Sequence, residues 1–85
     1  NGDQNIQLIP NPANESVAIA FEFPKTANYE VKIIDALGKE KFVSKRKFTE
    51  GIQTINVNTK NYNQGVYTVI IVTKNNVNSA RLIIK

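Results

Sequence analysis

The chain has 85 residues, of which 41% are hydrophobic, and it contains no cysteine, histidine, methionine or tryptophan. This length provides for one small domain, and the missing residue types exclude disulfides, thiol nucleophiles and the usual histidine and cysteine sites for zinc and haem. Eleven Lys and Arg against seven Asp and Glu give a formal net charge of +4, and most of the surplus falls within residues 39–47.

Alternating apolar and polar residues predict β-strands along the chain and no helix. Around residues 15–23 the apolar side chains recur with a period of two, which is typical of a half-buried strand. The same alternation marks residues 28–36 and 52–58, whereas residues 66–74 are apolar on both faces and predict a central strand covered on both sides. With the less regular runs included, we expect seven strands at residues 5–9, 15–23, 28–36, 40–48, 52–58, 66–74 and 77–84.

Turn-forming residues separate these runs at short spacing, which favours an antiparallel sandwich over a fold with crossover helices. The segment from Asp35 to Gly38 has Asp at the first position of a turn and Gly where a left-handed backbone is expected. Asn75-Asn76 predicts a two-residue hairpin, because Asn tolerates the positive φ that such a turn needs. Residues 40–48 fit least well and predict either a bulge or an edge strand with a charged middle. The expected fold class is therefore all-β, a single antiparallel immunoglobulin-like β-sandwich of about seven strands.

Residues suited to catalysis or metal binding are not brought together by this pattern. The serines have no histidine partner, and sequence neighbours such as Ser44 and Lys45 point to opposite faces of a strand. Asp and Glu occur singly, which argues against a glycosidase-type acid pair and against a calcium site. We therefore expect no enzyme, no cofactor and no metal ion.

A basic segment is the main charged feature of the chain. Its candidate anion contacts are Lys41, Lys45, Arg46 and Lys47. A charge-dense surface attracts polyanions such as lipopolysaccharide, but the simpler interpretation is a solvated edge strand whose charges oppose aggregation. No aromatic residues alternate with these cations as stacking platforms, so we expect no nucleic-acid partner. Dimerisation through an edge strand is left open.

Four motifs follow one another along the chain. They are Ile9-Pro10-Asn11-Pro12-Ala13, then residues 31–40, then residues 63–69, and finally residues 80–85, which end in Lys85. Each motif alone is common, but the ordered set resembles the C-terminal sorting domain of the type IX secretion system, type A, over essentially the whole chain.

Two segments depart from the commoner pattern of that family. Tyr62-Asn63-Gln64 stands where a leucine-rich stretch is more usual, and Lys45-Arg46-Lys47 is unusually basic. The first departure is consistent with Tyr62 packing in place of an aliphatic residue. The second leaves open an extra contact with an anionic partner.

Five residues of the motifs are interpreted as defining the fold. Pro10 and Pro12 fix φ and hold the chain extended around Asn11, at a stiff corner after the first strand. Asp35 and Gly38 close a hairpin.

The resemblance implies an export signal. In that family the domain is the last part of a larger precursor, passes through the periplasm, and is recognised by the outer-membrane translocon. Commonly a sortase cleaves just upstream of the domain and joins the cargo to anionic lipopolysaccharide at the cell surface. Residues 1–85 would form this domain, with residues 1–4 as a candidate residual linker from the N-terminal cargo. By position, the residues expected to be recognised are Gly65, Val66, Tyr67, Arg81, Leu82, Ile83, Ile84 and Lys85.

Two other functions remain as alternatives. One is an adhesive β-sandwich appended to a surface enzyme and contacting carbohydrate. Sugar sites usually present exposed aromatics, whereas the Tyr and Phe residues here mostly fall on inward phases of their strands. The other is polyanion binding through residues 39–47, which predicts retention on heparin that weakens steeply with salt.

Overall fold

The structure is a computed structural model and describes residues 6–85, so the candidate linker at residues 1–4 lies outside the described residues. The described part is all-β and contains no helix, and therefore no helix able to span a membrane. Its strands are β1 (Ile6–Ile9), β2 (Ser16–Phe23), β3 (Ala27–Ile34), β4 (Glu40–Phe48), β5 (Gly51–Asn58), β6 (Gly65–Val72) and β7 (Val77–Ile84). The seven predicted strands are thus confirmed within residues 6–85, with boundaries shifted by two residues or fewer; residue 5, where the first predicted strand begins, lies outside the described residues.

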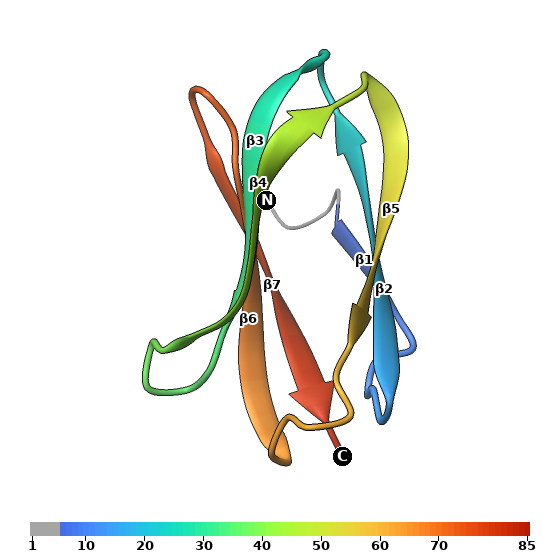
Figure 1. The fold of residues 1–85 in the computed structure, drawn as a ribbon, viewed down its shortest axis with the longest axis vertical. Coiled ribbons are helices and arrows are strands. Elements are labelled where there is room, and N and C mark those ends of the chain that lie inside the picture. Colours follow the sequence, from blue (N-terminus) through green and yellow to red (C-terminus); the bar gives the residue numbers. More distant parts are fainter. Residues whose placement is uncertain (1–5) are drawn as a thin grey trace.

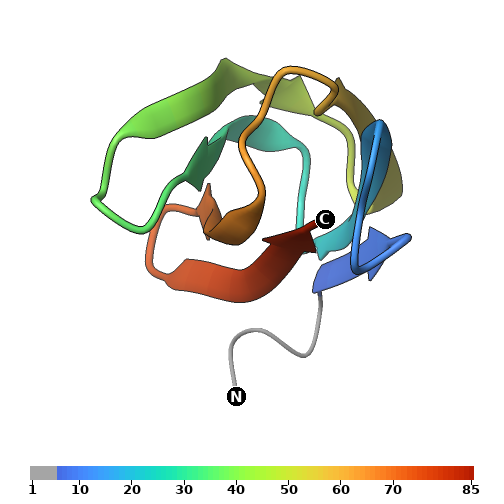
Figure 2. The same cartoon turned by 90° about the horizontal axis from the view of Figure 1, so that it is seen from below.

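The strands form two antiparallel sheets that face each other (Figure 1). One sheet has three strands in the order β1-β2-β5, and the other has four in the order β4-β3-β6-β7. β1 and β7 lie side by side where the two sheets meet, as Figure 2 shows from the lower end of the molecule. This arrangement is an immunoglobulin-like sandwich, which confirms the predicted fold class.

The core lies between the sheets because alternate side chains of each strand point inward. β2, β3 and β6 supply its fully buried centre, which consists of Val17, Ile19, Val31, Ile33, Val69 and Ile71. β2 and β4 end at the top of the molecule in Figure 1. Their last residues begin an aromatic cluster that spans the two sheets, with the Phe23 ring stacked on Phe48 at 4.5 Å between centroids. Tyr29 packs against Phe23 with a centroid distance of 4.7 Å.

The β6–β7 connection corrects one prediction. It is a four-residue loop, Thr73 to Asn76, rather than a two-residue turn at Asn75-Asn76. Thr73 closes the loop: its N–H donates to the Asn76 carbonyl at 2.8 Å, and its Oγ1 accepts from the Asn76 N–H at 3.1 Å. No non-glycine residue among residues 6–85 has a positive φ. The threonine side chain therefore does what the sequence analysis assigned to asparagine backbone geometry.

β4 combines both features that its irregular pattern predicted. It is the outermost strand of the four-stranded sheet, and its pairing with β3 shifts register between Ile33 and Ile34. Lys45, Arg46 and Lys47 are exposed. The charged middle of an edge strand is therefore confirmed, together with an irregularity near its start.

β6 is central in its sheet, as expected, but only one of its faces is covered. Tyr67, Val69 and Ile71 are buried between the sheets, whereas Val66 on the other face is 49% exposed. No element of residues 6–85 lies over this outer face. The prediction that β6 is covered on both sides is therefore wrong, because no other strand in the described part of the chain packs on its outer face.

Candidate recognition site

The Pro-Asn-Pro corner lies against the last strand. Asn11 follows β1, and its side-chain Nδ2 donates to the carbonyl of Arg81 at 3.0 Å. Its Oδ1 accepts from the N–H of Ile83, also at 3.0 Å. The peptide bonds preceding Pro10 and Pro12 are both cis. Because Pro10 and Pro12 have no N–H, the side-chain carboxamide of Asn11 makes the hydrogen bonds of this corner to the strand.

Ala13 continues the same contact through its backbone. Its N–H donates to the Ile83 carbonyl at 2.7 Å, and its carbonyl accepts from the Lys85 N–H at 2.9 Å, forming a parallel bridge with Ile84. We call the side-chain bonds of Asn11 together with these backbone bonds the Asn11 clamp. The clamp occupies the edge of β7 that does not pair with β6, so this end of β7 presents few free backbone groups to another strand.

The closing strand divides its residues between core and solvent. Leu82 is fully buried and Ile84 is 2% exposed, so both side chains pack in the core. Arg81, Ile83 and Lys85 are exposed. In the folded domain Arg81, Ile83 and Lys85 are therefore accessible to a partner. The buried side chains of Leu82 and Ile84 hold the strand in position.

The Gly65-Val66-Tyr67 segment pairs directly with the closing strand. Gly65 lies opposite Ile84 and Val66 opposite Ile83. Gly65 has a φ of +154°, a conformation that an L side chain rarely adopts. The outward side chains of Val66 and Ile83 are neighbours on the outer face of the sheet, so the two proposed recognition segments form one surface.

Tyr67 has a structural position in this site. It is 4% exposed, and its hydroxyl donates to the Asn63 carbonyl at 2.6 Å. Tyr29 makes the equivalent bond to Lys25, also four residues before it. Such bonds are the tyrosine corners of immunoglobulin-like sandwiches, where they fasten the chain as it enters a strand.

Tyr62 packs over the same corner. Its ring lies 5.5 Å from that of Tyr67, and its hydroxyl donates to the Lys41 carbonyl at 3.3 Å. Burial, with a smaller contribution from Tyr67, raises the pKa of Tyr62 above its usual value of 10.0. The tyrosine thus links the start of β4 to the loop before β6.

Asp35 organises the β3–β4 hairpin at the same end of the sandwich (Figure 1). Its Oδ1 accepts the N–H groups of Leu37 and Lys39, each at 2.9 Å, and Gly38 has a φ of +86°. The Lys39 hydrogen bond lowers the pKa of Asp35 most, and the Leu37 bond and the nearby Lys41 and Lys39 charges lower it further against the opposing effect of desolvation. The predicted hairpin is confirmed.

The candidate anion contacts do not converge on one spot. Lys45 and Lys47 project from the outer face of the sheet, whereas Arg46 points to the other side and lies 4.0 Å over the Phe48 ring. Lys41 lies where the β3–β4 register shifts. Lys45 also approaches Glu30 at 4.0 Å, which offsets part of its charge.

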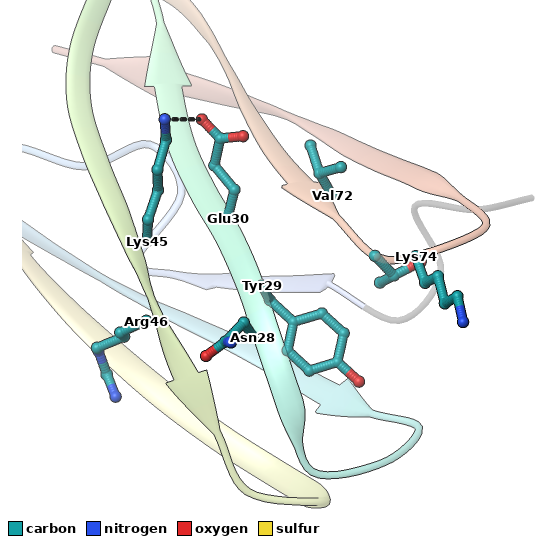
Figure 3. Close-up of a pocket in the computed structure, with 8 residues that line it drawn as sticks. Asn28, Tyr29, Glu30, Lys45, Arg46, Val72 and Lys74 are labelled. Atoms are coloured by element: carbon teal, nitrogen blue, oxygen red, sulfur yellow. Dashed lines mark ion pairs between the residues drawn. The ribbon is translucent and has the colours of Figure 1, made fainter.

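A shallow depression of about 370 Å³ lies beside this strand (Figure 3). Its lining includes Glu30, Lys45, Val72 and Lys74. Within residues 6–85 no group of three acidic, histidine or cysteine residues is placed to hold a metal ion. Every tyrosine and phenylalanine is buried or half-buried, so the structure offers no exposed aromatic platform on residues 6–85 for a sugar.

A family model for the secretion system C-terminal sorting domain matches residues 7–85. The chain belongs to this family. The sorting domain is a C-terminal export signal for type IX secretion, which directs a protein across the outer membrane to the cell surface or the medium. No curated protein matches the chain.

The motifs of the sorting domain could be predicted from the sequence, but not the contacts that join them. Asn11 was predicted to form part of a stiff corner, whereas its hydrogen bonds to β7, with partners 70 and 72 residues away, were not predicted. An amide side chain between two residues that lack N–H groups was the available signal. The uncovered outer face of β6 was not predicted either. A strand that is apolar on both sides has the same sequence pattern whether the second face packs within this chain or against another molecule.

Proposed function

We propose that the folded sorting domain presents its export signal as a single surface, which the outer-membrane translocon reads. The Asn11 clamp is the observation that supports this proposal. It joins the first and last motifs of the chain, and the β6–β7 ladder adds the third motif beside them. A signal assembled from segments this far apart exists only in the folded state.

Within this surface the exposed side chains would make the contacts. These are Val66, Arg81, Ile83 and Lys85. The buried members of the predicted set, Tyr67, Leu82 and Ile84, would act by holding the two strands in register. Gly65 would contribute through its backbone conformation.

The remaining steps concern the cargo. The cargo would be the protein segment N-terminal to residues 1–85, delivered through the periplasm, and a sortase would cut upstream of β1. The sorting domain would then be a substrate of that sortase and not an enzyme. Joining of the cargo to anionic lipopolysaccharide would follow at the cell surface.

The experiment fuses residues 1–85 to the C-terminus of a periplasmic reporter in a host with type IX secretion. Deleting residues 81–85 would be a poor test, because it removes the buried Leu82 and Ile84 and would unfold the domain. Arg81→Glu with Ile83→Glu changes only exposed side chains. We expect this double variant to lower surface reporter by about tenfold or more.

The control for that test is Thr54→Glu, an exposed position on the outer face of the other sheet. It should leave both export and the thermal midpoint close to wild type. Normal export of the Arg81→Glu, Ile83→Glu variant would contradict the proposed recognition surface.

Polyanion contact by β4 is the second candidate, and it is favoured by Lys45 and Lys47, which are exposed on the same outer face of the sheet. The sorting domain would then be retained on heparin, with elution that falls steeply in salt. Reversing Lys45, Arg46 and Lys47 to Glu should abolish retention, and unchanged retention would contradict the contact. Pairing of two β4 edges would be the corresponding route to a dimer, since β4 is the outermost strand of its sheet.

A further inference from the structure

The outer faces of the two sheets differ in chemistry. Apart from Ile52, the three-stranded sheet turns small and polar side chains outward along its longer strands: Ser16, Ala18, Ala20, Glu22, Thr54, Asn56 and Asn58. The four-stranded sheet turns outward the aliphatic side chains of Ile34, Val43, Val66, Ile70, Val72, Val77 and Ile83, which we call the aliphatic face. Polar or charged side chains lie among them, mainly on β3 and β4. An antiparallel sheet with a solvated face normally alternates apolar inward and polar outward residues. β6 departs most from that pattern, because three of its four outward residues, Val66, Ile70 and Val72, are aliphatic.

The aliphatic side chains gather in two groups on the β6–β7 ladder. Val66 lies opposite Ile83, and Val72 opposite Val77 with Ile70 beside it on β6; Thr68 and Arg81 lie between the two groups. Side chains directly opposed on one face are about 4.5–5.5 Å apart and in contact. Val77 is 67% exposed and Val66 49%, so the face is open to solvent. Exposed apolar side chains that gather in this way are a feature of interaction sites.

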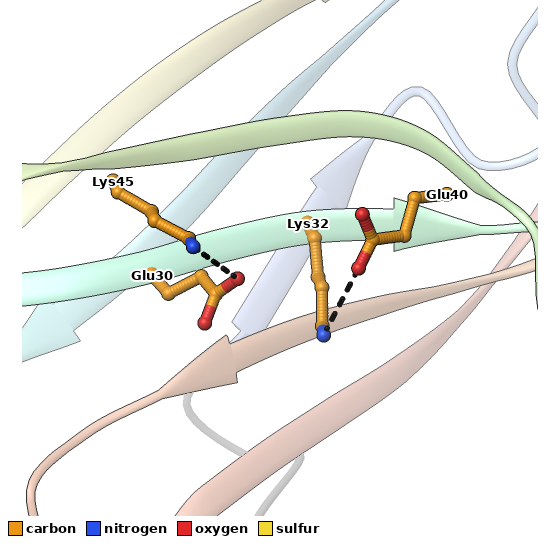
Figure 4. A network of polar contacts seen from close by, with 4 residues as sticks. All are labelled: Glu30, Lys32, Glu40 and Lys45. Atoms are coloured by element: carbon orange, nitrogen blue, oxygen red, sulfur yellow. Dashed lines mark hydrogen bonds and ion pairs between the residues drawn. The ribbon is translucent and has the colours of Figure 1, made fainter.

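Two ion pairs lie on the aliphatic face (Figure 4). Lys32 Nζ lies 3.4 Å from Glu40, and Lys45 Nζ lies 4.0 Å from Glu30. A hydrocarbon layer against this face would strip water from these charged groups and offer no polar partner in return, which is costly. The face is therefore poorly suited to a lipid surface.

The aliphatic face carries a surplus of positive charge. Lys47 and Arg81 project from it and pair with no carboxylate among residues 6–85. Two copies meeting through this face would bring these cations together, which disfavours a dimer. A protein surface with an apolar centre and an acidic rim would both cover the aliphatic side chains and neutralise the cations.

We propose that the aliphatic face docks such a protein surface, apolar at its centre and acidic at its rim, belonging to the export machinery. This proposal rests on the function proposed above and extends the recognition surface from the end of β7 across the sheet. Val66, Arg81 and Ile83 already belong to both surfaces. The depression beside Val72 lies at the opposite end of the face (Figure 3) and gives room for one anchoring side chain of the partner.

The test uses aliphatic side chains outside the recognition residues named above. Val43→Asp with Val77→Asp places two carboxylates on the face without disturbing the core, because these side chains are 41% and 67% exposed. In the reporter fusion we expect surface reporter to fall by about tenfold or more. The thermal midpoint should stay within a few degrees of wild type. The matched control is Ile52→Asp, which is 71% exposed on the other sheet and should be exported normally.

Normal export of the double variant, or an equal loss in Ile52→Asp, would overturn the docking face and leave the proposed function standing. A wild-type fusion that stays in the periplasm would contradict the proposed function and this inference with it. Two measurements on the purified 85-residue chain test the other possible partners of the aliphatic face. Sedimentation detects a second copy of the chain, and flotation with phosphatidylglycerol vesicles detects binding to a lipid surface. Dimerisation or vesicle binding that the double variant abolishes would overturn the protein partner.

Discussion

Asn11 shows how one side chain can hold together segments from opposite ends of a chain. Its carboxamide both donates to the Arg81 carbonyl and accepts from the Ile83 N–H. This pair of bonds mimics the backbone of a neighbouring strand. The closing strand is therefore fastened on both of its edges, by β6 on one side and by the Asn11 clamp on the other.

Removing the Asn11 side chain should weaken the fold. Asn11→Ala loses two hydrogen bonds, and at about 0.5–1.5 kcal/mol each the free energy of unfolding should fall by about 1–3 kcal/mol. Urea denaturation measures this change, and hydrogen exchange at the Ile83 amide should lose protection. Asn14→Ala is the control, because Asn14 is exposed and its side chain makes no hydrogen bond within residues 6–85. An Asn11→Ala variant as stable as Asn14→Ala would contradict the clamp.

Thr59 offers a change expected to be neutral or stabilising. Its side chain is fully buried, and its Oγ1 has no hydrogen-bond partner among the described residues. Thr59→Val replaces the hydroxyl by a methyl group of similar size, so the free energy of unfolding should stay level or rise by up to about 1 kcal/mol. Thermal unfolding measures the effect. A loss of more than about 1 kcal/mol would show that the hydroxyl has a partner in solution.

Asp35 should make the stability of the domain depend on pH in acid. Its hydrogen bonds to Lys39 and Leu37 hold its pKa below the usual value of 3.8 in the folded state. A carboxyl with a lowered folded pKa stabilises the protein above its unfolded pKa, and this contribution is lost as the pH falls through the folded pKa. Asparagine cannot ionise, so in the Asp35→Asn variant the free energy of unfolding should fall less steeply as the pH is lowered in acid. An NMR titration that places the folded pKa of Asp35 at or above 3.8 would contradict this prediction.

At the scale of strands, the period-two alternation was sufficient to predict most of the fold. β2 and β3 alternate because one face of each packs on the opposite sheet, so a pattern visible in sequence follows directly from burial. The pairing of β4 with β3 was predicted from the turn at Asp35 to Gly38, whereas the pairings of β2 with β5 and of β3 with β6 depend on contacts between distant segments and were not predicted. The β6–β7 loop was misjudged because a threonine hydroxyl closed it in place of a strained asparagine.

The contact between β2 and β4 should carry much of the stability of the sandwich. Phe23 is 1% exposed and stacks on Phe48 across the two sheets. Phe23→Ala leaves a cavity at this junction and should lower the free energy of unfolding by about 3–5 kcal/mol. Phe42→Ala is the comparison, since Phe42 on the same β4 strand is only half-buried and should cost less. Urea denaturation measures both variants. An equal loss in the free energy of unfolding for Phe23→Ala and Phe42→Ala would contradict a special contribution of the Phe23–Phe48 contact.

At the scale of the whole molecule, the two ends of the sandwich are built differently. The aromatic cluster fills one end, whereas the Asn11 clamp, the tyrosine corner of Tyr67 and the closing residues of β7 gather at the other. The recognition residues proposed on β7 therefore lie away from the aromatic cluster. We expect Phe23→Ala to lower stability, and Arg81→Glu with Ile83→Glu to lower export without a loss of stability.

The motifs of the sorting domain could be found in the sequence, but the surface that they build could not. Order and spacing identified Pro10 to Pro12, residues 65–67 and residues 81–85 as one set. Which of these side chains face solvent depends on the register of β6 with β7, which places Val66 beside Ile83 and buries Tyr67 with Leu82. The aliphatic face emerged only when four strands were assembled into one sheet.

The most direct test of the export function compares one fusion in two hosts. Residues 1–85 are joined to the C-terminus of a periplasmic reporter, and the fraction of reporter cleaved by added protease on intact cells is measured. The account predicts that the reporter becomes accessible at the surface only in the host whose type IX machinery is intact. A reporter that stays protected in that host, or that becomes equally accessible in a host lacking the machinery, would contradict the account.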